Sequence, residues 1–246
     1  MLKGKTAFIT GTNRGIGKAL VVEFARNGAN IIAHARGETP EFLSMVHDVA
    51  TEYGVNITPL FFDMTDSEAM RIAVRTLISS KVPVNVLINN AGMPHFGLFQ
   101  MTSMKKIREI FDINLFAQME LTQLLLRPMM RHHGGCIINI GSVMGVDLPQ
   151  GSSAYGLSKT TLMAFTRVLA AECGPFGLRV NAIAPGLITT DMAEQMGDRA
   201  QDVMLAQCAL KRLGLPQEIA KIAVFLASEN ASYVNGQILR ADGGKA

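Results

Sequence analysis

Short apolar runs rich in β-branched residues alternate with longer segments whose apolar residues recur at helical spacing. The expected strands are 6–10, 30–35, 56–62, 84–88, 136–140, 179–184 and 237–240. The expected helices are 18–26, 39–53, 66–80, 103–133, 152–173 and 216–228, with N-caps at Thr39 and Asp66 and a kink or break at Pro128. Because buried parallel strands read as continuous apolar runs, this alternation predicts an α/β fold. We expect residues 1–246 to form a single-domain Rossmann-type, doubly wound parallel sheet of about seven strands, with helices on both faces.

A glycine-rich segment follows the first expected strand. Glycines stand at positions 11, 15 and 17, in the spacing Gly-x-x-x-Gly-x-Gly, and a helical pattern begins directly after them. A strand that breaks at glycine and restarts as a helix exposes backbone N–H groups, which favour phosphate together with the helix dipole. A tight turn between a strand and a helix would explain the same glycines, so this segment alone does not establish a nucleotide site.

Small and polar residues also gather where the other expected strands end. Ligands of doubly wound sheets bind outside the carboxyl ends of the strands. The residues at these ends are Gly11, Arg36, Asp63, Asn90–Gly92, Gly141–Ser142 and Pro185–Gly186. We therefore expect one ligand site along this edge of the sheet.

The end of the second expected strand indicates which nicotinamide cofactor fits. A site selective for NAD places a carboxylate there for the ribose 2′-hydroxyl, whereas this chain has Ala35 and Arg36. Arg36 could form paired hydrogen bonds with a 2′-phosphate, and Arg14 could supply a second cation. The two arginines favour NADP(H), although both could be solvated surface charges. Asp63 is expected to accept a hydrogen bond from the adenine amino group, or else to be a plain turn residue.

Tyr155 and Lys159 are four residues apart on an expected helix and so share a face. A phenol with pKa ~10 needs about 4 kcal/mol of preference for the phenolate to reach ~7. One ammonium at ~4 Å supplies about that much at an effective dielectric of ~20. Tyr155 tuned in this way could protonate a carbonyl oxygen as hydride reaches its carbon. An ordinary amphipathic surface pair would have the same spacing.

Two further polar residues could take part in such a reaction. The Ser142 hydroxyl, at the end of the fifth expected strand, could bind the same carbonyl oxygen and fix its orientation. Asn114 lies inside an expected helix, where asparagine is mildly unfavourable, and could hold a water beside Lys159. Taken singly, Ser142 also reads as a loop serine and Asn114 as a solvated residue.

Composition excludes several classes of function. With 48% hydrophobic and 17% charged residues the chain is not expected to be disordered. A formal charge of +3 without a basic stripe argues against a nucleic-acid partner. The three cysteines, Cys136, Cys173 and Cys208, lack metal-ligand spacing and suggest reduced thiols, with no metal site. Because the first strand begins almost at once and no apolar run approaches ~20 residues, we expect a cytoplasmic protein without a signal peptide or a membrane span.

The motifs, in this order, resemble those of the short-chain dehydrogenase/reductases over essentially the whole chain. The matching segments are the cofactor loop Thr10–Gly17, the Asn-Asn-Ala-Gly motif Asn89–Gly92, the Tyr-x-x-x-Lys motif Tyr155–Lys159 and the nicotinamide-lining segment Pro185–Thr190. Asn114 and Ser142 fall where the family has its catalytic Asn and Ser. The resemblance implies that Tyr155 is the proton donor and that Lys159 also binds the nicotinamide ribose.

The resemblance also implies a full set of site residues. Asn114, Ser142, Tyr155 and Lys159 would be catalytic, and Ser142 and Tyr155 would bind substrate. The expected NADP(H) contacts are Gly11, Asn13, Arg14, Gly15, Ile16, Gly17, Arg36, Asp63, Met64, Asn90, Ala91, Gly92, Tyr155, Lys159, Pro185, Gly186, Ile188 and Thr190. Most members of the family are dimers or tetramers, so we expect a homodimer or a homotetramer.

Within this family the chain is most similar to the bacterial 3-oxoacyl-[acyl-carrier-protein] reductases of fatty acid biosynthesis. The similarity rests on Arg212–Ala220, Phe225–Ser228 and Asp242–Gly244, which sugar-alcohol and steroid dehydrogenases also share. It implies reduction of a 3-oxoacyl thioester, linked to acyl carrier protein or CoA, to the 3-hydroxyacyl form. His133 and Ala171 stand where carrier-protein reductases commonly have arginines. Nearby cations that could replace them are Arg127, Arg131 and Arg167.

The segments expected to frame the substrate are Met93–Met101 and Leu187–Met204, opposite Val143–Leu148 and Gly151–Ser153. Met192, Met196 and Met204 would suit a lid over a flexible acyl chain, although ordinary helix packing explains them equally well. One alternative function is oxidoreduction of a small secondary alcohol or ketone in a biosynthetic pathway. Another is a non-catalytic NADP-binding scaffold. The presence of all three of Ser142, Tyr155 and Lys159 argues against it.

Overall fold

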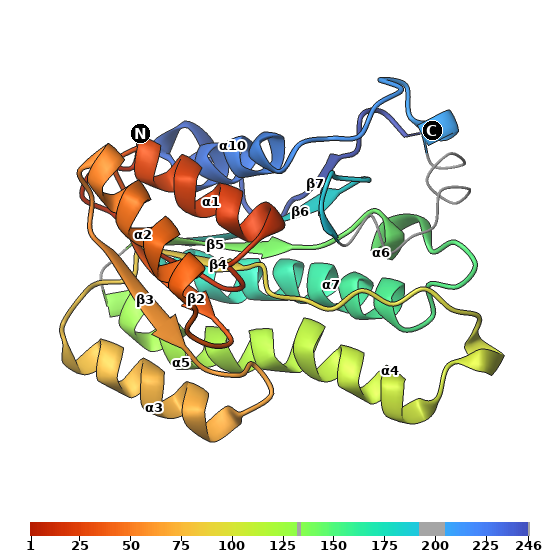
Figure 1. Cartoon of the computed structure of the whole chain (residues 1–246), viewed down its shortest axis with the longest axis horizontal. Helices are drawn as coiled ribbons and strands as arrows, with labels where there is room; N and C mark the ends of the chain where they lie inside the picture. The colour runs from red at the N-terminus through yellow and green to blue at the C-terminus, as the bar shows by residue number, and fades with distance from the viewer. Residues whose placement is uncertain (132–133, 192–204, 246) are drawn as a thin grey trace.

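One parallel sheet forms the middle layer of the protein (Figure 1). The computed structural model describes residues 1–131, 134–191 and 205–245. Within them the strands are β1 (Thr6–Ile9), β2 (Asn30–Ala35), β3 (Ile57–Phe61), β4 (Val86–Asn89), β5 (Gly135–Ile140), β6 (Leu178–Pro185) and β7 (Ile238–Ala241). Their order is β3-β2-β1-β4-β5-β6-β7, and every neighbouring pair is parallel. The expected doubly wound sheet is confirmed, and its order reverses between β1 and β4, where such sheets bind ligands.

Helices cover both faces of this sheet (Figure 1). On one face lie α1 (Gly15–Arg26), α2 (Pro40–Tyr53) and α10 (Pro216–Ala227). On the other lie α3 (Ser67–Ser79), α4 (Met104–Phe111), α5 (Ala117–Arg131) and α7 (Tyr155–Cys173). The short elements are η1 (Phe99–Met101), η2 (Asp112–Phe116), α6 (Met144–Asp147), η3 (Gly174–Phe176) and η4 (Glu229–Ala231). No helix of the described ranges is long and apolar enough to cross a membrane.

Two helix starts agree with the sequence, and one does not. Thr39 accepts a hydrogen bond from the Phe42 N–H, and Asp66 accepts one from the Ala69 N–H, so both act as N-caps. The helix expected from residue 152 begins only at Tyr155, because Ser152 donates its N–H and its hydroxyl to the Pro149 carbonyl in a preceding turn.

The helical segment expected over 103–133 is continuous from Met104 to Arg131 within the described residues. Its middle part, η2, is a π-helical turn between α4 and α5, and the sequence pattern gave no sign of it. Pro128 lies inside α5 without ending it, since the helix continues to Arg131. A proline near the end of a helix interrupts little of the remaining hydrogen bonding. His133 lies outside the described residues.

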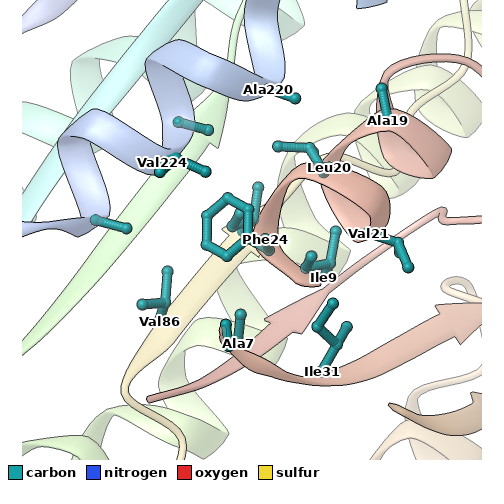
Figure 2. Close-up of a cluster of buried hydrophobic side chains, with 14 of the residues drawn as sticks. Ala7, Ile9, Ala19, Leu20, Val21, Phe24, Ile31, Val86, Ala220 and Val224 are labelled. Carbon is teal, nitrogen blue, oxygen red and sulfur yellow. The ribbon is translucent and has the colours of Figure 1, made fainter. Parts of the chain in front are cut away.

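The core beneath the predicted phosphate loop fixes where α1 begins. Leu20 and Phe24 of α1 are fully buried and face Ile9 of β1 and Val224 of α10 (Figure 2). Burying a side chain of this size contributes roughly 1.5–3 kcal/mol. This packing holds the first turn of α1 against the end of β1, which is the position that a phosphate site requires.

Candidate active site

A cavity of about 790 Å³ opens along the carboxyl edge of the sheet. Its walls come from residues that end or follow β1, β2, β3, β4, β5 and β6. It brings together Gly11, Asn13, Arg14, Gly15, Ile16, Gly17, Arg36, Asp63, Met64, Asn90, Ala91, Gly92, Ser142, Tyr155, Lys159, Pro185, Gly186, Ile188 and Thr190. Asn114 is the one expected site residue that does not line it, because its side chain is buried behind the wall.

The glycine loop has the close backbone packing that a phosphate cradle needs. Gly11 and Gly15 have φ angles of 67° and 53°, in the left-handed region that favours glycine. A Cβ atom built on Gly17 would lie 1.9 Å from the Gly11 carbonyl oxygen, so no side chain fits there. The loop therefore brings the N-terminus of α1 directly against the end of β1, with backbone N–H groups open toward the cavity.

Arg14 does not point freely at a phosphate site. Its Nη1 atom donates to the Asp191 Oδ2 atom at 2.9 Å, and both side chains are exposed. Arg36 is also exposed and lines the same cavity. The second cation that the sequence suggested is thus paired with a carboxylate in this structure.

We expect Asp191→Asn to tighten NADP binding by about two- to fivefold, because exposed ion pairs of this kind are worth roughly 0.2–1 kcal/mol and the free Arg14 would then face the 2′-phosphate. Equilibrium titration with NADP+ and with NAD+ measures the effect. The gain should be confined to NADP+. An equal gain for both cofactors would mean that Arg14 does not contact the 2′-phosphate.

Asp63 is held in its ionised form. The Thr65 N–H and the Thr65 hydroxyl donate to its Oδ1 atom at 2.8 and 2.7 Å. These hydrogen bonds lower the pKa of the Asp63 carboxyl group from its ordinary value. Asp63 is therefore an acceptor at the cavity wall, as its expected role toward an adenine amino group requires.

Tyr155 and Ser142 form the polar end of the predicted reaction site. The Tyr155 side chain is buried, and this burial raises the pKa of its phenol, while a hydrogen bond with the Ser142 hydroxyl lowers it. The Ser142 hydroxyl also accepts from the Met144 N–H at 3.1 Å. A carbonyl oxygen that meets both hydroxyl groups would find two hydrogen-bond donors aimed at one point.

Lys159 lies beside the Tyr155 ring. Its Nζ atom is 6.0 Å from the centre of the phenol ring and donates to the Ile140 carbonyl oxygen at 2.8 Å. Burial lowers the pKa of the Lys159 amine to about 8. At ~6 Å and an effective dielectric of ~20, the ammonium contributes about 3 kcal/mol, or roughly two pKa units.

The tuning of the Tyr155 phenol by Lys159 stays a prediction. The phenol pKa lies above its ordinary value, because burial of the ring outweighs the favourable hydrogen bond. Additional positive charge or hydrogen bonding at the phenol is needed before it becomes acidic at neutral pH.

Asn114 is placed by the π-helical turn. Its Oδ1 atom accepts from the Met93 N–H at 2.7 Å, and its Nδ2 atom donates to the Met93 carbonyl at 3.0 Å and to the Ser158 hydroxyl at 3.1 Å. A Cβ on Gly92 would lie 3.2 Å from the Asn114 Oδ1 atom and 3.3 Å from the Lys159 Nζ atom. The Asn114 Oδ1 atom and the Lys159 Nζ atom therefore both lie close to Gly92. The role of Asn114 in holding a water remains a prediction.

The wall near Tyr155 is largely apolar. Phe96 lies with its ring centre 6.2 Å from that of Tyr155, and its loop is tied down by the Gly97 N–H, which donates to the Gly151 carbonyl at 3.1 Å. Other apolar residues of the cavity wall are Met93, Pro94, Val143, Met144 and Leu187. Residues of the expected segments 93–101, 143–148 and 187–204 thus line the cavity, whereas none of Gly151–Ser153 does. Met192, Met196 and Met204 lie outside the described residues.

Sequence reasoning missed several residues of the cavity. Lys106 and Glu109 of α4 line the cavity and form an ion pair of 3.1 Å. Their spacing along the helix did not indicate that they face the cavity. His34 of β2 lines it as well. A histidine inside an otherwise apolar strand was the one available signal, because burying an ionisable ring calls for specific partners.

Comparisons with known proteins agree with this arrangement. A family model described as enoyl-(acyl carrier protein) reductase matches residues 11–246. The 3-oxoacyl-[acyl-carrier-protein] reductase FabG of Chlamydia trachomatis serovar D is 33% identical over 247 residues, covering 100% of this chain and 99% of that protein. A structure of a putative gluconate dehydrogenase from Agrobacterium tumefaciens superposes with a TM-score of 0.93 at 30% identity, covering 99% of this chain and 96% of the other. A putative NAD(P)-dependent gluconate 5-dehydrogenase from Beutenbergia cavernae, solved with bound NADP at low occupancy, gives a TM-score of 0.92 at 33% identity, covering 99% and 97%.

Proposed function

The chain belongs to the short-chain dehydrogenase/reductase family, and we propose that it reduces the 3-oxo group of an acyl thioester to a secondary alcohol. It is an NADP-dependent oxidoreductase of that family. The observation that carries the proposal is the convergence of Ser142, Tyr155 and Lys159 in the same cavity as the glycine loop. The thioester itself rests on similarity to the 3-oxoacyl reductases and on the apolar wall beside Tyr155.

The cavity fits NADP(H) on features of its own residues. Gly11 and Gly15 adopt left-handed backbone angles, Gly17 leaves no room for a side chain, and Arg36 offers a cation where a 2′-phosphate would bind. When bound, NADPH supplies the hydride for carbonyl reduction. In our proposal the Ser142 hydroxyl donates to the carbonyl oxygen and fixes its orientation.

Tyr155 would then transfer its phenolic proton to that same oxygen. The positive charge of Lys159 favours the phenolate that remains. Asn114 would restore the proton through a water near Lys159. This sequence of steps leaves the hydroxyl on the substrate and requires Tyr155 to be reprotonated from solvent in each turnover.

We further propose that an acyl carrier protein presents the substrate. Arg127, Arg131 and Arg167 are exposed on α5 and α7, and cations suit an acidic carrier. Ala171 is exposed on α7 without a charge. Arg127 lies 13 residues beyond Asn114, which is about 20 Å along the helix. A carrier bound at these arginines would therefore have to deliver its substrate on a long arm.

Assembly into a homodimer or homotetramer forms part of the same proposal. Large apolar side chains are exposed on η2 and α7, where Phe116, Leu157 and Val168 are 55%, 45% and 56% accessible. Exposed apolar side chains of this size favour association. Light scattering of the purified protein gives the subunit number directly.

A rate screen tests the proposed substrate. NADPH oxidation is followed with 3-oxoacyl groups on acyl carrier protein and on CoA, with keto sugars, and with cyclic ketones. We expect the 3-oxoacyl thioesters to give the highest kcat/KM. A preference for sugars would favour the small-alcohol alternative, which the gluconate dehydrogenase structures support. Bound NADP without turnover on any class would favour the non-catalytic scaffold.

The cofactor preference depends on Arg36. Arg36→Asp should lower the ratio of NADP to NAD preference by roughly 10- to 100-fold, because a hydrogen bond to a charged group is worth about 1.5–3 kcal/mol and the new carboxylate repels the 2′-phosphate. The kcat/KM values for NADPH and NADH measure the ratio. Arg75→Asp, on the exposed face of α3, is the matched control. If the ratio does not move, Arg36 is only a surface charge.

A further inference from the structure

We propose that His34 is a positioning residue for the cofactor, because its neutral ring joins the glycine loop to the end of β3. The inference concerns the adenosine half of the NADP(H) site and does not depend on which carbonyl compound is reduced. His34 is 1% exposed, yet it lines the cavity between Gly11 and Asp63. It is therefore hidden from bulk solvent and placed where two cofactor-binding loops meet.

Both nitrogen atoms of the ring are engaged. The Gly11 N–H donates to the Nδ1 atom at 3.3 Å, and the Nε2 atom lies 3.0 Å from the Phe62 carbonyl oxygen. A carbonyl oxygen can only accept, so Nε2 must carry the hydrogen and Nδ1 must be the acceptor. One neutral tautomer satisfies both neighbours, whereas a doubly protonated ring would oppose the Gly11 N–H with a second donor.

The backbone of His34 reinforces the same connection. Its carbonyl oxygen accepts from the Thr12 N–H at 2.9 Å and from the Thr12 hydroxyl at 3.0 Å. The ring packs against the Phe62 ring with a centre-to-centre distance of 4.1 Å. Since Gly11 and Thr12 open the glycine loop and Phe62 precedes Asp63, one residue sets the spacing between the phosphate and adenine parts of the site.

The surroundings keep this ring neutral. The flanking strands β1 and β3 carry no ionisable side chain, and the core on this side of β2 is formed by Phe8, Phe62, Met64 and Met70. Burial lowers the pKa of His34 to about 4, although the Phe62 carbonyl and the nearby Asp63 carboxylate act in the opposite direction. Arg36, directly after the end of β2, lies near Asp63 and balances its charge.

The test compares His34→Phe and His34→Gln with the wild type. Phenylalanine keeps the ring stacking and removes both hydrogen bonds, whereas glutamine retains a donor and an acceptor. We expect His34→Phe to raise the Kd for NADP+ and the KM for NADPH about tenfold, with kcat at saturating cofactor changed less than twofold. His34→Gln should recover part of the loss. His47→Gln, exposed on α2, is the control and should change nothing.

A spectroscopic measurement on the wild type makes the test independent of variant folding. Imidazole ¹⁵N chemical shifts should show a neutral His34 with its hydrogen on Nε2 down to about pH 5. Fragment binding adds a second readout, since 2′,5′-ADP should lose affinity for His34→Phe and nicotinamide mononucleotide should not. The proposal is overturned if the His34 ring is doubly protonated at pH 6, or if His34→Phe binds NADP+ within twofold of the wild type.

Discussion

Replacing Tyr155 with phenylalanine is expected to lower kcat for carbonyl reduction by roughly 10²- to 10⁴-fold, the range that a positioned acid contributes. The phenolic hydroxyl is the one group of the proposed site that combines a transferable proton with a hydrogen bond to Ser142. The ring itself would remain, packed near Phe96, so the shape of the cavity should be kept. Affinity for NADPH should therefore change by less than about fivefold, because a single neutral hydrogen bond is worth about 1 kcal/mol or less in this setting.

Steady-state kinetics with the best substrate of the screen, together with NADPH titration, measure both effects. Tyr233→Phe is a matched control, since that ring is fully exposed and does not line the cavity. The control should retain wild-type rates. Turnover by Tyr155→Phe at the wild-type rate would remove Tyr155 from its role as proton donor, even if NADPH binding stayed intact.

Lys159→Met is expected to have the second-largest effect on activity. Without the ammonium 6.0 Å from the ring centre, the phenol loses about 3 kcal/mol of support for its charged form, so the pH of maximal turnover should rise by roughly two units. NADPH should also bind more weakly, because the family resemblance implies that Lys159 binds the nicotinamide ribose. A pH–rate profile from pH 6 to 10 measures the shift, and an unchanged profile would contradict the role of Lys159.

The same variant should be more stable at neutral pH. Burial lowers the pKa of Lys159 from 10.5 to about 8, so below pH 8 the folded state carries a charge that it disfavours. In that range the unfavourable contribution amounts to roughly 3 kcal/mol, offset in part by the hydrogen bond to Ile140. Methionine removes the charge, and the free energy of unfolding at pH 7 should rise by about 1–3 kcal/mol.

The direction of the pH dependence gives an internal check. Between pH 8 and 10.5 the unfolded chain binds more protons at Lys159 than the folded chain, so wild-type stability should gain a contribution as pH rises through this window. Urea unfolding at pH 7, 8, 9 and 10 should show that gain in the wild type and in the Lys105→Met control, whose side chain is exposed. Lys159→Met should lack it. A Lys159→Met variant less stable than wild type at pH 7 would show that the ammonium is compensated within the fold.

Much of the site was readable because its residues follow strands. Each expected strand ended within a few residues of its observed end, and the carboxyl ends of parallel strands meet at one edge. Gly11, Asp63, Asn90 and Ser142 therefore had to lie together once the sheet was predicted. Tyr155 and Lys159 were readable for a similar reason, since helical spacing puts them on one face.

Other features depended on partners that no local pattern reveals. Arg14 and Asp191 are 177 residues apart, and their ion pair exists only because β6 ends beside the glycine loop. The π-helical turn that places Asn114 satisfies contacts with Met93 and Ser158 rather than a preference of its own residues. A histidine in an apolar strand has no local explanation. The position of His34 is explained only by the Gly11 N–H and the Phe62 carbonyl, which its ring contacts.

The sequence by itself determined the parallel sheet, the succession of helices and strands along the chain, and most of the residues around the cavity. It could do so because hydrophobic periodicity and glycine geometry are local properties of the chain. The tertiary structure alone decided the protonation of Tyr155, Lys159 and His34 and the pairing of Arg14. These depend on burial and on distances between segments far apart along the chain, and the free energy of a charge changes steeply with both.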